Sequence, residues 1–183
     1  MGSKPTNGPI ALLTAVIVTA GVIAACGGEE AATTTAAPTA QLIVQADTVS
    51  GPLNIPNDQM AGRVCVAQSR FARNSEIVWR VRLTDPLTGE QLDDTGVQTL
   101  QVKLADGQVL DMHYGDHPRD NPTDKFWTTS FDIPEGYPTG TLGYEVVAVS
   151  TSGMTGNFTP FNVAPSLLTI TDEVYETIEE GSS

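Results

Sequence analysis

The sequence predicts an all-β protein, built as an antiparallel β-sandwich or barrel, and three observations lead to this fold class. Between residues 41 and 171, apolar and polar residues alternate with a period of two, which is typical of strands that have one face on a core. Turns rich in glycine and proline separate these segments at short intervals. No convincing helical pattern follows residue 40. Such strands become stable when two apolar faces pack together.

Residues 76–83 form the clearest expected strand. Its odd-numbered positions are all apolar and include Trp79, whereas Arg80 and Arg82 occupy even-numbered positions. We therefore expect Trp79 in the core and Arg80 in water. The other expected strands cover residues 41–49, 63–67, 100–104, 110–114, 127–133, 142–148, 157–163 and 167–171.

Turn sequences separate these strands. Residues 85–89, Asp-Pro-Leu-Thr-Gly, place proline and glycine where a turn uses them. Asp106-Gly107 lies between two alternating segments, and this dipeptide is a strong signal for a hairpin. The sequence thus predicts eight or nine short strands.

The N-terminal residues have the three parts of an export signal. Residues 1–25 contain one cation, Lys4, then an uncharged apolar run over residues 10–25 that ends in small residues. A spanning helix needs roughly 20 apolar residues, so a cleaved signal is favoured over a permanent anchor. An uncleaved helix is the alternative, and it also places the rest of the chain outside the cytoplasm.

Residues 23–26, Ile-Ala-Ala-Cys, resemble the lipobox of bacterial lipoproteins. This resemblance implies that Cys26 is acylated, that residues 1–25 are removed, and that the mature protein is held on a membrane by its lipid. Gly27 after the cysteine resembles the signal of lipoproteins that are sorted to the outer membrane, if the host has two membranes.

Composition divides the mature chain into three parts. Residues 26–40 comprise the lipidated cysteine and a run of small and polar residues, which we expect to be a flexible tether. Residues 41–171 are expected to form one domain, and residues 172–183 an acidic, frayed tail. The chain has 9 basic and 22 acidic residues, so nucleic acid is not an expected partner.

Residues 140–153 resemble the penultimate strand of immunoglobulin-like and fibronectin-like modules, where a tyrosine bonds back to the preceding turn. The resemblance covers residues 70–165 and implies a single Ig-like sandwich of about 7–9 strands. Tyr144 would be the corner tyrosine and Trp79 a core tryptophan. Cys65 has no intrachain partner once Cys26 is lipidated, so the disulfide of antibody domains is missing. Because Cys65 lies in a short apolar stretch, we expect it to be buried.

One dense group of potential metal ligands occurs in the chain, and it comprises Asp111, His113, Asp116 and His117. Histidine and aspartate together suit Zn²⁺ or Cu²⁺, whereas the carboxylates with Asp120 and Asp124 suit Ca²⁺. The spacing matches no standard motif, and a solvated polar loop over residues 116–125 is the alternative.

The sequence offers little support for catalysis, because it has no nucleophile elbow and no phosphate-binding loop. Trp127 and Tyr137 are candidates for contact with a partner, or they cap the end of the core. We expect a non-catalytic, membrane-anchored extracytoplasmic lipoprotein that serves in binding, adhesion or assembly, with a protein or a cell-wall glycan as partner. The alternative is a metal-binding surface lipoprotein.

Overall fold

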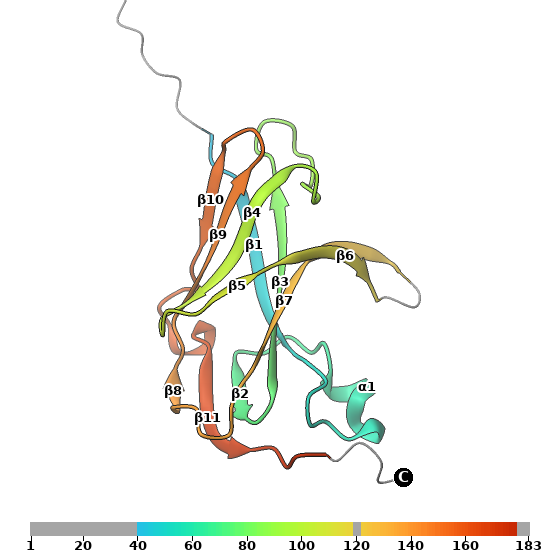
Figure 1. The fold of residues 1–183 in the computed structure, drawn as a ribbon, viewed down its shortest axis with the longest axis vertical. Helices are drawn as coiled ribbons and strands as arrows, with labels where there is room; N and C mark the ends of the chain where they lie inside the picture. Colours follow the sequence, from blue (N-terminus) through green and yellow to red (C-terminus); the bar gives the residue numbers. More distant parts are fainter. Residues whose placement is uncertain (1–39, 119–121, 179–183) are drawn as a thin grey trace, which may run out of the picture. The chain divides into compact units, whose positions relative to one another are not determined.

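The computed structural model describes residues 40–118 and 122–178, and it confirms the predicted all-β class. Eleven strands occur in these residues, more than the eight or nine expected, and they form a sandwich with antiparallel sheets (Figure 1). Cys26 and the expected signal over residues 1–25 lie outside the described residues.

Two four-stranded antiparallel sheets make up most of the domain. The first has the order β1 (Ile43–Ser50), β3 (Glu76–Thr84), β7 (Asp124–Asp132) and β6 (His113–His117). The second has the order β10 (Thr155–Phe158), β9 (Tyr144–Ser150), β4 (Val97–Leu104) and β5 (Val109–Asp111). The predicted Asp106-Gly107 turn joins β4 to β5, and Gly107 has the positive φ of 95° that such a turn requires.

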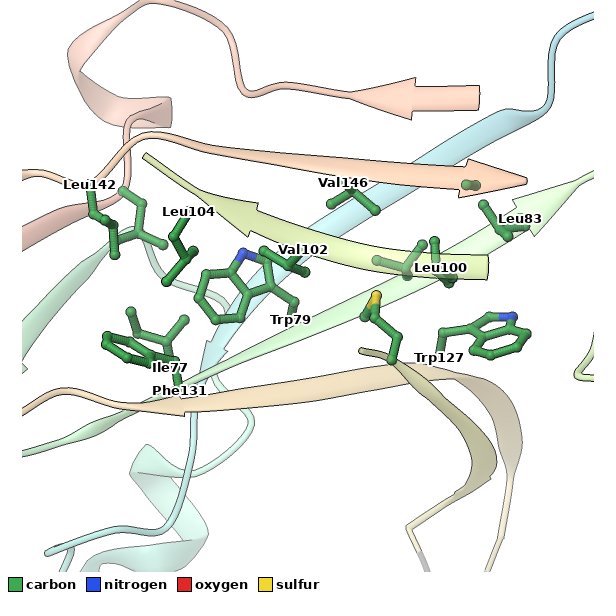
Figure 2. Close-up of a cluster of buried hydrophobic side chains, with 14 of the residues drawn as sticks. Ile77, Trp79, Leu83, Leu100, Val102, Leu104, Trp127, Phe131, Leu142 and Val146 are labelled. Carbon is green, nitrogen blue, oxygen red and sulfur yellow. The ribbon is translucent and has the colours of Figure 1, made fainter. Parts of the chain in front are cut away.

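The core lies between these two sheets (Figure 2). The predicted alternation in β3 is confirmed, because Trp79 is fully buried whereas Arg80 lies on the opposite, partly exposed face. Tyr144 from β9 contacts Trp79 edge to face, with the ring centroids 5.6 Å apart. Sequence periodicity therefore identified the inner face of β3 correctly.

Burial has consequences for both rings of this pair. It raises the pKa of Tyr144 to about 12, because the phenolate loses its hydration, and the charge of Asp47 adds to the rise. Trp79 Nε1 is buried and makes no hydrogen bond of normal geometry. Its N–H group nevertheless faces the Tyr144 hydroxyl and partly opposes the rise in the pKa of Tyr144. The expected bond from Tyr144 to the preceding turn does not occur among the described residues, where its ring packs on Trp79 and Phe158 instead.

The chain crosses from one sheet to the other at Met112. We expected one return strand over residues 110–114, but β5 pairs with β4, and β6 pairs with β7. Met112 lies between them with its side chain buried, and its amide donates to Leu100 O at 3.0 Å. A single extended segment thus supplies an edge strand to both sheets.

The expected strand over residues 63–67 is wrong. A 3-10 turn, η1 (Asn57–Gln59), leads into one turn of helix, α1 (Met60–Arg63), and Ala67 makes only an isolated bridge to Val49. The strand lies a few residues later, as β2 (Arg70–Arg73).

A third sheet has the order β2, β11 (Thr169–Val174) and β8 (Gly140–Thr141), with β2 and β11 parallel. The turn η2 (Ala164–Ser166) precedes β11. The boundary expected at residue 171 falls inside β11, and the Tyr175 amide beyond it still donates to Arg73 O at 2.9 Å. Residues 172–178 are therefore part of the folded unit, not a frayed tail.

Candidate functional site

A groove of about 960 Å³ lies on the outer face of the sheet β1-β3-β7-β6. Its floor consists of outward-facing side chains of β3 and β7, and one wall comes from the segment between β1 and β2. Residues 113 and 117 of β6 line it as well. Its volume falls within the range of small-molecule and cofactor sites.

Alternation in the strands gives this face its polar character, because the apolar residues turn inward. Arg80 Nε and Nη2 donate to the two carboxylate oxygens of Asp47 at 2.9 and 2.6 Å, across the β1–β3 pair. This hydrogen bond raises the pKa of Arg80. Arg82 Nη2 pairs with one carboxylate oxygen of Asp124, from β3 to β7. Both guanidinium charges are thus balanced within the sheet.

The Phe126 ring on this face contacts two side chains, a histidine from β6 and an arginine from β3. The His117 ring stacks on it, with centroids 4.1 Å apart and planes 13° from parallel. The Arg80 guanidinium carbon lies 6.0 Å from the Phe126 centroid. Neighbouring strands bring the three side chains together, because β7 lies between β3 and β6.

Glu76 closes the groove at its other end, where it is half-buried beneath Gly51. The Glu76 carboxylate packs directly against Gly51, so a side chain at residue 51 would displace the Glu76 carboxylate from this position. Burial raises the pKa of the Glu76 carboxyl, since it removes water from the charged form. Asp132 adds to this rise, whereas hydrogen bonds from Ser130 and the Leu53 backbone oppose it.

The four predicted metal ligands are not brought together. Asp111 belongs to β5 and accepts a hydrogen bond from Gln101 Nε2 at 2.7 Å, in the other sheet. Asp116 pairs with Lys125 Nζ at 3.1 Å, on the face of β6 opposite to His113 and His117. Within residues 40–118 and 122–178, no group of three or more His, Cys, Asp or Glu side chains could hold a metal ion.

Trp127 does not lie on the surface as a partner contact. Its side chain is 6% exposed, and its Nε1 donates to Leu92 O at 3.1 Å. Tyr137 is half-buried, contacts Phe131 edge to face at 5.5 Å, and donates its hydroxyl to Asp106. Both side chains therefore cap the core, which is the alternative that the sequence left open.

Cys65 is exposed, so its expected burial is wrong. It has a φ of 62° and lines the groove, and the apolar stretch around it is not buried either, since Val66 is 46% exposed. Arg80 and Phe126 were not identified as site residues from the sequence. The alternation of β3 did assign Arg80 to the outer face, but nothing in the sequence shows that β3, β7 and β6 are neighbours.

In residues 40–118 and 122–178, none of the helical segments could span a membrane. Comparison of the chain with protein-family models, with curated proteins and with solved structures found no match.

Proposed function

We propose that this chain is a lipid-anchored extracytoplasmic protein whose Ig-like β-sandwich is a non-catalytic binding module, and that its ligand occupies the groove on the outer face of β1-β3-β7-β6. The observation that carries the binding role is the groove itself, which combines a paired polar floor with a wall from residues 51–65.

The side chains of the groove favour recognition over catalysis. Arg80 and Asp124 both line the groove, and each is paired with an opposite charge outside it, Asp47 and Arg82 respectively. These two groove residues therefore present hydrogen-bonding groups with little net charge. Thr128 and Ser130 add hydroxyl groups, while Val78 and Phe126 add apolar surface. Such a mixture of apolar surface with a few placed polar groups is typical of binding sites.

The anchor rests on the sequence of residues 23–26, whose cysteine would carry the lipid. Residues 27–39 would then separate the membrane from the domain, which begins with Leu42 and β1. The partner is accordingly a protein or glycan of the envelope, within reach of the tether.

The test is a capture experiment with the native envelope, with Thr128→Trp as the blocking variant. Thr128 lies on the groove floor, so an indole there fills the space that the ligand needs. Lys103→Trp is the matched control, because Lys103 is exposed on β4 of the other sheet. We expect Thr128→Trp to lose at least about tenfold in affinity for the captured partner, which corresponds to about 1.4 kcal/mol.

Equal affinity of the two tryptophan variants would contradict the assignment of the ligand to this groove. Thermal unfolding of both variants checks that neither has lost the fold.

A further inference from the structure

The chain beyond β11 runs toward α1 as an extended segment, residues 175–178 (Figure 1). Two asparagines hold this segment through its backbone. Asn74 Nδ2 donates to Tyr175 O at 2.6 Å, and Asn54 Oδ1 accepts from the Ile178 amide at 3.1 Å. The segment is thus bound at both of its ends.

The two asparagines also bind each other. Asn54 Nδ2 donates to Asn74 O at 2.9 Å, so each side chain amide has a defined partner. Both residues have left-handed backbones, with φ of 57° and 58°. Asparagine adopts this conformation more readily than most residues, which explains why this residue type occupies both positions.

Arg63, the last residue of α1, makes the third attachment. Its guanidinium carbon lies 4.8 Å from the centroid of the Tyr175 ring, and Nη2 donates to the Tyr175 hydroxyl. Arg63 Nη1 also donates to Gln59 Oε1 at 2.9 Å. The single turn of helix is therefore joined to residues 175–178 by a side chain that also braces the turn itself.

These attachments lie next to the wall of the groove. Pro52, Val64 and Cys65 line the groove, and Val64 directly follows Arg63. The base of this segment is held independently, because the Cys65 amide donates to Ser50 O at 2.9 Å. Residues 52–64 extend from that base as a loop whose far side contacts residues 175–178.

We propose that residues 175–178 are a strap that fixes the loop 52–64 and thereby sets the width of the groove. The strap couples the groove to the end of the folded chain, so any event that detaches residues 175–178 also loosens the wall. Its role in regulating ligand binding rests on the proposed function of the groove, whereas its mechanical role does not.

Hydrogen exchange of the full-length protein in detergent tests the strap. Three amides report on the loop, because each donates to a backbone carbonyl within it: those of Ile55, Gln59 and Val64. Truncation after Val174 removes the strap, and truncation after Ile178 is the matched control. We expect the three amides to exchange at least about tenfold faster in the first truncation only, since several hydrogen bonds are lost together.

Point variants separate the strap from any general loss of stability. Asn74→Gly removes the amide that holds Tyr175 O but tolerates the positive φ, and Tyr175→Ala removes the contact with Arg63. Glu176→Ala is the control, because that side chain is exposed. We expect the first two variants to accelerate the loop amides about tenfold, with β3 amides unchanged.

Unchanged exchange of the loop in Asn74→Gly and Tyr175→Ala would overturn the proposal, as would equal acceleration in β3. These variants decide the matter even if the truncation after Val174 does not fold. The measurement needs no ligand. If the loop amides exchange faster in these variants but no partner is captured in the groove, only the proposed function is refuted. If their exchange is unchanged but a partner is captured, only the strap is refuted.

Discussion

Replacing Trp79 with alanine tests how the core is built. Trp79 is fully buried and contacts the Tyr144 ring edge to face at 5.6 Å. Deletion of a buried tryptophan side chain costs about 3–5 kcal/mol, through lost transfer free energy and the cavity that remains. Trp79 Nε1 is buried without a hydrogen bond of normal geometry and works in the opposite direction, because its removal relieves a desolvation cost of about 1–3 kcal/mol. We therefore expect Trp79→Ala to lower the free energy of unfolding by about 2 kcal/mol.

Trp79→Phe separates the two contributions. Phenylalanine keeps most of the apolar contact and has no buried N–H group, so we expect a loss below about 1.5 kcal/mol. Arg80→Ala is the control for the strand register, since Arg80 lies on the outer face and forms an exposed ion pair with Asp47. Exposed pairs of this kind contribute about 1 kcal/mol or less.

Urea unfolding of the chain from residue 37 onward provides the measurement, with far-UV circular dichroism as the signal. Equal losses for Trp79→Ala and Arg80→Ala would refute the register of β3. A loss for Trp79→Phe as large as that for Trp79→Ala would show that the indole N–H has a partner in the folded protein.

Two further predictions concern charge and attachment. The raised pKa of Glu76 means that the native state binds its proton more tightly than the unfolded chain, so its contribution to stability falls as pH rises above the ordinary value of 4.5. We expect Glu76→Gln to unfold at higher urea than the parent at pH 7, with the difference shrinking below pH 4.5; a constant difference would contradict this. Cys26→Ser should abolish lipid labelling and move the protein out of the detergent phase, whereas Cys65→Ser should change neither; a Cys26→Ser protein that still carries lipid would exclude this anchor.

The fold class and the inner face of β3 could be predicted because alternation with a period of two directly reports which side chains are buried. The same rule failed for residues 110–114. Asp111 and His113 were expected in one strand, but the crossing at Met112 places them in different sheets. Alternation continues through such a crossing, so the sequence contains no local sign of it.

The groove could not be predicted for a related reason. Its floor requires β3 to lie beside β7 and β7 beside β6, and strand order depends on long-range pairing that no local pattern specifies.

Cys65 illustrates a second limit. Its apolar neighbours suggested burial, but the whole segment lies at the surface, and Val66 and Ala67 are exposed together with Cys65.

The central position of β11 has a consequence for the order in which the chain folds. β2 and β8 do not pair with each other, and each completes its hydrogen bonding only through β11. Phe71 and Thr171, joined by a hydrogen bond, are 100 positions apart, and contacts of such separation form slowly. The edge of β2 therefore stays unpaired until β11, near the end of the domain, has been synthesised. A nascent chain that stops before residue 169 leaves two strands without a neighbour, and those edges are the places where such an intermediate would aggregate.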